Sequence, residues 1–109
     1  MNYIISGKVI RGDGYGKKIG FPTVNLETAM KEFPPEGIYS GVVMLNNLEY
    51  RVGIVVGPGK KIEAHLMGYN GDAYGKQVSL QINKFLREYK KFDTEEELKE
   101  QIKKDLKQC

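Results

Sequence analysis

The clearest strand pattern in the chain is Lys76-Gln77-Val78-Ser79-Leu80-Gln81-Ile82-Asn83-Lys84-Phe85-Leu86. Polar and apolar residues alternate along it, which is typical of a β-strand with one face in a core and the other toward solvent. The apolar positions of the alternation are Val78, Leu80, Ile82 and Leu86. This pattern predicts a long strand whose apolar face contributes to the core of the protein.

Shorter segments of the same character lie on the N-terminal side of this strand. Turn residues separate them, among them Asn46-Asn47, because asparagine tolerates a positive φ, and Gly57-Pro58-Gly59-Lys60. The predicted strands cover residues 3–10, 21–26, 38–45, 48–56 and 61–67. Segments this short, joined by turns, indicate antiparallel pairing within an all-β fold.

The apolar spacing changes near the C-terminus. Beyond Asp93, one apolar residue recurs every four positions, and the residues between are mostly charged. Thr94 and Glu97 form a capping box that begins a helix there, whose apolar stripe consists of Leu98, Ile102 and Leu106. Five or six strands followed by one amphipathic helix predict a small antiparallel barrel with the helix packed on its wall.

Length and composition set limits on function. A chain of 109 residues fits one domain, 1–109, and a net charge of +3 is too small to indicate nucleic-acid binding. Cys109 is the only cysteine, which suits a reducing compartment. No apolar run has the length of a membrane span, and the N-terminus does not resemble a signal peptide. We therefore expect a cytoplasmic protein with neither a membrane nor a nucleic acid as partner.

One stretch carries chemistry that a plain barrel does not need: Gly12-Asp13-Gly14-Tyr15-Gly16-Lys17-Lys18-Ile19-Gly20-Phe21-Pro22-Thr23-Val24-Asn25. Glycines let backbone N–H groups approach an anion, and lysines add positive charge, so the segment could hold phosphate. Thr23 and Asn25 offer hard oxygen ligands that suit magnesium. The alternative is an ordinary turn between strands, since the pattern is neither a P-loop nor a dinucleotide fingerprint.

Two further positions are candidates for function. Glu63 and His65 share the face of their predicted strand opposite Ile62, Ala64 and Leu66, so Glu63 is either a general base or a solvated surface carboxylate. His65 fits a structural hydrogen-bonding role. Arg87 follows the last predicted strand, near aromatic residues, where it could stack on a planar ring, bind phosphate or simply belong to a charged connection.

Taken together, these motifs resemble the riboflavin kinase family, the flavokinase module of bacterial FAD synthetases. The resemblance extends from near the first residue to the helix. Its pieces are Gly7-Lys8-Val9-Ile10-Arg11-Gly12-Asp13-Gly14, Ile19-Gly20-Phe21-Pro22-Thr23-Val24-Asn25-Leu26, Gly37-Ile38-Tyr39, Ile62-Glu63-Ala64-His65-Leu66, Gly71-Asp72-Ala73-Tyr74-Gly75, Leu86-Arg87-Glu88 and Lys91-Phe92.

The resemblance implies a six-stranded Greek-key barrel that transfers the γ-phosphate of ATP to riboflavin, giving FMN, with the help of magnesium. It implies that Thr23 and Asn25 sit at the magnesium–phosphate centre, that Asn25 and Glu63 are catalytic, and that Glu63 is the base. It places Arg87 in a loop that closes on the flavin. The loop over the nucleotide maps to Gly12, Gly14, Gly16, Lys17 and Lys18.

The chain also departs from the family pattern. Members usually carry an Asn-Ile-Gly turn and a Pro-Thr pair before the glutamate strand, where this chain reads Gly53-Ile54-Val55-Val56-Gly57-Pro58-Gly59. This difference leaves a non-catalytic flavin- or nucleotide-binding barrel as the alternative function. Bifunctional relatives also carry an FMN adenylyltransferase domain, which these 109 residues do not contain. Conversion of FMN to FAD is therefore not predicted for this chain alone and would need a separate or trimmed domain as partner.

Overall fold

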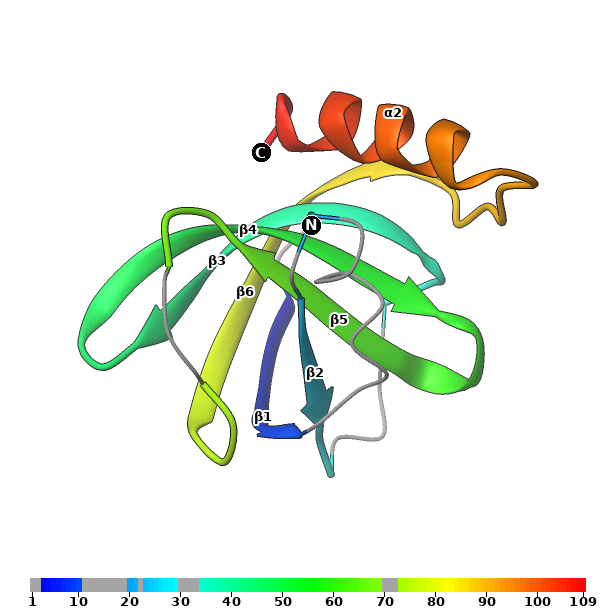
Figure 1. Ribbon diagram of the computed structural model, residues 1–109. Coiled ribbons are helices and arrows are strands. Elements are labelled where there is room, and N and C mark those ends of the chain that lie inside the picture. Colours follow the sequence, from blue (N-terminus) through cyan, green and yellow to red (C-terminus); the bar gives the residue numbers. More distant parts are fainter. Residues whose placement is uncertain (1–2, 11–19, 22, 30–33, 70–72) are drawn as a thin grey trace.

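The computed structural model describes residues 3–10, 20–21, 23–29, 34–69 and 73–109. Six strands and a C-terminal helix account for most of these residues (Figure 1). The elements are β1 (Tyr3–Ile10), β2 (Val24–Glu27), β3 (Gly37–Leu45), β4 (Leu48–Gly57), the short 3₁₀ turn η1 (Pro58–Lys60), β5 (Lys61–Leu66), β6 (Gln77–Arg87) and α2 (Glu95–Leu106). The predicted strands are all present, with β2 displaced toward Glu27.

The strands close into a barrel in the order β1-β2-β5-β4-β3-β6, and every neighbouring pair is antiparallel. Strands β3, β4 and β5 follow one another directly, whereas β6 returns beside β3, which is the Greek-key arrangement. The β3–β4 hairpin turns at Asn46 and Asn47, whose φ angles are 54° and 65°. These left-handed conformations match the right-handed twist of the flanking strands, as the asparagine pair predicts.

The core fills the barrel with the inward residues that the alternating patterns predict. Val78, Leu80 and Ile82 of β6 are buried, as are Val52, Ile54 and Val56 of β4. The alternation along β6 ends at Ile82, however, because its pairing with β3 shifts register between Ile38 and Tyr39 and between Ser40 and Gly41. These bulges re-aim the end of β6, so the prediction that Leu86 belongs to the core was wrong: Leu86 is only half-buried.

Helix α2 lies across the outside of the barrel, above β4 and the end of β6 (Figure 1). Thr94 is its N-cap, and the Thr94 hydroxyl accepts a hydrogen bond from the Glu97 backbone N–H at 3.2 Å. At the other end, the Leu106 side chain sits over Gly53 of β4, where an added Cβ would lie 3.1 Å from Leu106 Cδ2. The missing side chain of Gly53 therefore lets the last helical turn approach the barrel wall.

Within the described residues, none of the helical segments is both long and apolar enough to cross a lipid bilayer.

Candidate active site

Two of the predicted site residues lie directly opposite each other on the barrel surface. Asn25 of β2 pairs with Glu63 of β5, and the neighbouring pairs are Val24 with Ala64 and Leu26 with Ile62. Because Ala64 and Ile62 point into the core, Asn25 and Glu63 both project from the outer face. Cross-strand partners are the closest side-chain neighbours that a sheet provides. The outward position of Glu63 is thus confirmed.

Glu63 does not point into open solvent, because α2 and the segment before it stand over this part of the barrel. The space between them is a cavity of about 430 Å³. Its apolar walls include Phe21, Ile38, Val55, Leu98, Ile102 and Leu106. Its polar groups include Thr23, Glu63, His65, Arg87 and Lys91. Glu63 is therefore a half-buried residue of the cavity lining, and its role as a base stays a prediction.

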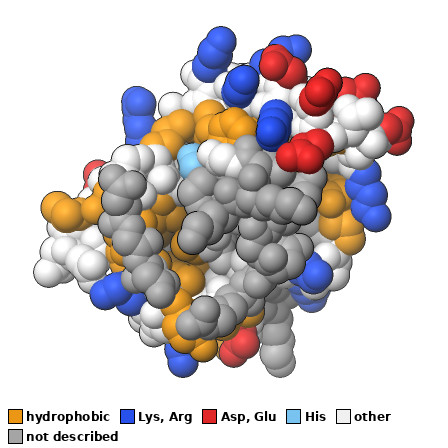
Figure 2. Space-filling view, viewed as in Figure 1, with side chains coloured by type: hydrophobic (Ala, Val, Ile, Leu, Met, Phe, Trp, Pro, Cys, Tyr) orange, Lys and Arg blue, Asp and Glu red, His pale blue; other side chains and the backbone are white. Residues whose placement is uncertain are grey.

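The apolar stripe of α2 lines this cavity and also contacts the barrel wall. Leu98, Ile102 and Leu106 are half-buried, and they form the cavity roof. On the outer surface, hydrophobic side chains gather just below the charged residues of α2 (Figure 2). A cavity with mostly apolar walls and a few convergent polar groups is the usual form of a small-molecule site.

Thr23 and His65 lie on the β2–β5 side of the same cavity. The His65 ring meets the Phe21 ring edge to face, with centroids 6.2 Å apart. Ile10, which precedes the glycine-rich segment, pairs with Asn25. The predicted phosphate-binding residues themselves lie outside the described residues; they are Gly12, Gly14, Gly16, Lys17 and Lys18. Their role stays a prediction.

The donor set near Glu63 also bears on a metal. The described residues contain no cluster of three or more histidine, cysteine or carboxylate side chains that could enclose an ion. Thr23 and Asn25 supply neutral oxygen atoms, which fit magnesium held by one or two protein groups together with substrate phosphates. The residues present therefore fit a metal that arrives with a nucleotide.

Arg87 ends β6 and reaches from the barrel to the helix. Its Nε donates to both carboxylate oxygens of Asp105, at 3.0 and 3.2 Å, and its Nη2 donates to Asp105 Oδ2 at 2.9 Å. Nη1 donates to the Glu88 backbone oxygen at 3.0 Å. Asp105 balances the charge of the Arg87 guanidinium. Of the roles that the sequence left open for Arg87, this geometry therefore favours stacking on a planar ring over binding a phosphate.

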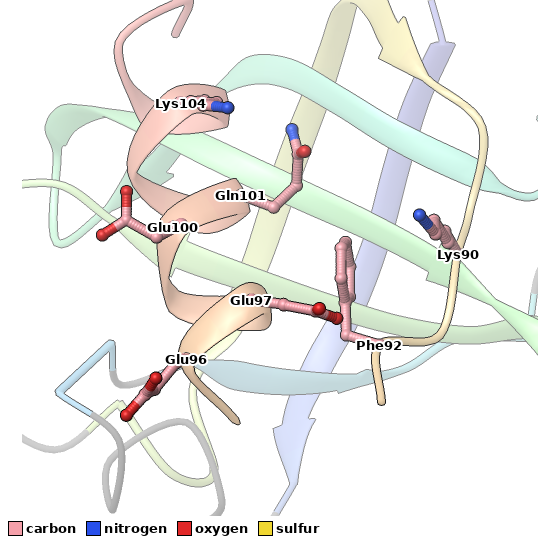
Figure 3. A pocket seen from close by; sticks show the side chains of 7 residues that line it. All are labelled: Lys90, Phe92, Glu96, Glu97, Glu100, Gln101 and Lys104. Carbon is pink, nitrogen blue, oxygen red and sulfur yellow. The ribbon is translucent and has the colours of Figure 1, made fainter. Parts of the chain in front are cut away.

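Phe92 and Lys90 form the edge of the cavity next to Arg87. The Phe92 ring centroid lies 5.6 Å from Arg87 Cζ and 5.3 Å from Lys90 Nζ, which is within cation–π range. The same two residues line a shallow groove on the outer side of this wall, and Glu97 and Gln101 extend toward it from α2 (Figure 3). Phe92 therefore separates the cavity from solvent.

Sequence reasoning missed Asp105, which is the only buried charged residue in the described part of the chain, at 6% exposure. Its position gave a signal. Asp105 follows Leu98 by seven residues and Ile102 by three, which puts it on the apolar side of the helix. A carboxylate on that side predicts a buried cationic partner, and Arg87 fills this role.

The comparisons with known proteins agree with this architecture. The family model described as riboflavin kinase matches residues 1–109. The RNA-binding riboflavin kinase RibR of Bacillus subtilis is 34% identical over 112 residues, which cover 94% of this chain and 48% of that protein. The bifunctional riboflavin kinase/FMN adenylyltransferase of Escherichia coli is 32% identical over 111 residues, covering 94% and 36%. The chain thus spans half or less of the length of these curated relatives.

Solved structures show the same likeness. A Streptococcus pneumoniae chain described as a macrolide-efflux protein superimposes with a TM-score of 0.89 at 28% identity, over 95% of this chain and 37% of that one. Riboflavin kinase from Trypanosoma brucei superimposes with a TM-score of 0.71 at 20% identity, over 97% and 73%, and this supports the fold alone. The match of the family model over the full length is decisive: this chain belongs to the riboflavin kinase family.

Proposed function

We propose that this protein phosphorylates riboflavin to FMN, with ATP as the phosphoryl donor and magnesium as the assisting ion. The observation that carries the proposal is the pairing of Asn25 with Glu63 on the outer face, where Glu63 lines the cavity under α2. A carboxylate on a rigid strand, beside a site large enough for a flavin, supplies the base that phosphoryl transfer to a hydroxyl needs.

The cavity suits the tricyclic ring of riboflavin. Its volume of about 430 Å³ falls in the range of small-ligand sites, and aliphatic side chains of α2 and β4 form two of its walls. The Arg87–Asp105 pair and the Phe92 ring provide a flat, electrically balanced edge. With the ring of riboflavin between these walls and this edge, the ribityl chain would extend toward Glu63 and Thr23.

Glu63 then accepts the proton of the terminal ribityl hydroxyl. The oxygen that loses the proton forms the new bond to the γ-phosphorus of ATP, and the bond from that phosphorus to the β–γ bridging oxygen breaks. ADP leaves with the bridging oxygen, and the ribityl group becomes the phosphate ester of FMN. Such transfers depend on positioning and charge balance more than on covalent help from the protein.

Thr23 and Asn25 would hold magnesium at the phosphates, and the ion would neutralise charge on the transferring group. Asn25 is well placed for this role because it lies beside both Glu63 and Ile10. The glycine-rich segment that follows Ile10 would contribute the remaining phosphate contacts through Gly12, Gly14, Gly16, Lys17 and Lys18. The transition state would thus form between β2, β5 and that segment.

Incubation with riboflavin, ATP and magnesium tests the proposal, with FMN separated by chromatography. We expect FMN to form with the parent protein and to depend on all three additions. Binding of riboflavin without FMN formation would instead support the alternative of a non-catalytic flavin- or nucleotide-binding barrel. Failure of the protein to bind either ligand would overturn both functions.

A further inference from the structure

We propose that Asp105 is the positioning residue of the flavin site: it orients Arg87 and cancels its charge, so that the cavity edge accepts a neutral ring. This inference rests on the proposed function, because it assigns the ring of riboflavin to the cavity under α2. Asp105 itself does not take part in phosphoryl transfer. It acts through Arg87 and, beyond Arg87, through Phe92.

The geometry of the pair is that of a fork. Arg87 Nε lies 3.0 Å from Asp105 Oδ1, and Arg87 Nη2 lies 2.9 Å from Asp105 Oδ2. Two parallel bonds of this kind fix the plane of a guanidinium group as well as its position. The Glu88 carbonyl holds the third nitrogen at 3.0 Å. Arg87 therefore presents one defined orientation at the cavity.

Asp105 is itself held in place. Gln101, one helical turn earlier, donates its side-chain N–H to Asp105 Oδ1 at 3.0 Å. The Asp105 side chain is only 8% exposed, compared with 22% for Arg87. A carboxylate that is buried and bonded from two sides has little freedom to release its partner. The helix thus carries a rigid acceptor for the residue that ends β6.

The consequence extends to the aromatic edge of the cavity. Phe92 lies against the guanidinium group, with its centroid 5.6 Å from Arg87 Cζ. If Arg87 changes its orientation, Phe92 loses the surface on which it rests. The charge matters too, because an unbalanced guanidinium in a partly dry cavity attracts the anionic product FMN more than neutral riboflavin. Asp105 therefore favours substrate over product.

The test compares Asp105→Asn with the parent protein, using fluorescence titration of riboflavin and of FMN without ATP. We expect the riboflavin dissociation constant to rise about tenfold or more, as misplaced binding groups commonly cause. FMN should lose less affinity than riboflavin, and the difference should shrink at high salt. The KM for ATP, measured by FMN formation, should stay within about twofold, since Asp105 belongs to α2 and the proposed phosphate-binding residues belong to β2 and the segment before it.

Two companion variants make the result specific. Glu100→Gln removes an acidic group from the same helix without touching Arg87, since Glu100 is solvent-exposed and pairs with Lys103. We expect it to bind both flavins like the parent. In an Arg87→Gln background, adding Asp105→Asn should cause no further loss of riboflavin affinity, because Asp105 acts through Arg87.

Several outcomes would overturn the proposal. One is an Asp105→Asn variant that melts at a lower temperature but binds riboflavin like the parent, which would make Asp105 only a helix anchor. Another is full additivity of the two substitutions. If the parent protein binds riboflavin but makes no FMN, only the proposed catalysis is contradicted. The comparison of riboflavin and FMN binding then still decides the role of Asp105. A parent that binds no riboflavin overturns both.

Discussion

Asn25 and Glu63 are 38 positions apart in the sequence and are direct partners across the β2–β5 pair. Their side chains share the outer face because the residues on either side of each one belong to the core side of the strands. The pair sets an amide and a carboxylate side by side on the barrel surface, and the carboxylate of Glu63 lines the cavity.

Replacing Glu63 by glutamine tests the general base. The substitution keeps the size of the side chain and removes its basicity, so turnover should fall by about a hundred- to ten-thousand-fold. Both ligands should still bind, because the cavity walls are unchanged. FMN formation measured by chromatography gives the rate. Glu49→Gln, in the exposed part of β4, is the matched control, and a parent-like rate for Glu63→Gln would leave Glu63 without a base role.

Thr23→Ala tests the oxygen ligand next to the phosphates. We expect a strong loss of turnover at saturating magnesium with an unchanged melting temperature, since Thr23 lines the cavity and is absent from the core. Thr23→Ser restores the hydroxyl and should recover most of the activity. Magnesium titrations of the turnover rate of both variants distinguish a ligand role of Thr23 from a purely structural one. If the Thr23→Ala variant has the turnover rate of the parent, Thr23 has only a structural role.

Arg87→Ala removes the guanidinium surface at the cavity edge. Riboflavin affinity should fall more than ATP affinity, and fluorescence and ATP titrations would measure the two. The variant should also lose about 3 kcal/mol of unfolding free energy, because Asp105 stays buried without its partner. Arg51→Ala, on exposed β4 surface, is the control for loss of an arginine. Equal, small changes for both ligands would argue that Arg87 only fastens the helix.

Tyr39 gives a prediction about alkaline pH. Its hydroxyl donates to the Pro35 carbonyl at 2.5 Å, and burial, aided by Tyr3, raises the pKa of Tyr39. The folded state therefore holds the phenolic proton more tightly than the unfolded state. This contribution to stability is complete below the unfolded pKa of about 10 and is lost as pH rises through the folded pKa.

Tyr39→Phe should thus cost about 1 kcal/mol at neutral pH, through the lost hydrogen bond. The difference in unfolding free energy between parent and variant should shrink above the unfolded pKa. Urea unfolding at a series of pH values measures it. A difference that stays constant into the alkaline range would contradict the assignment.

Gly41 tests the closure of the barrel. A Cβ at this position would lie 2.0 Å from the Gln81 backbone oxygen, at the β3–β6 seam beside a register shift. Backbone cannot yield as a side chain can, so Gly41→Ala should cost about 3 kcal/mol or more. Gly53→Ala is the matched control, because its Cβ would meet side-chain atoms, those of Leu106 and Cys109, and no backbone atom. Similar urea midpoints for the two variants would contradict this account.

Much of the architecture follows from local sequence. The alternation of Ile62, Ala64 and Leu66 with Glu63 determines which side of β5 is buried, since successive side chains leave a strand on opposite faces. Thr94 begins the helix through a hydrogen bond to a residue three positions away. These features need only near neighbours along the chain, so the residues themselves specify them. The local patterns left the number of strands at five or six. The family resemblance implied six strands with Greek-key connections.

Other features needed contacts between distant residues. The bulges of β6 arise where it pairs with β3. Lys84 interrupts the apolar face between Ile82 and Leu86, but only the pairing with β3 decides that Leu86 leaves the core. The cavity forms because α2 contacts the barrel at Gly53 and is tied to it by Arg87 and Asp105, whose positions differ by 18 in the sequence. Sequence periodicity determined which side of each element is apolar. Only tertiary packing decided what each side faces, because that depends on how elements far apart in the chain come together.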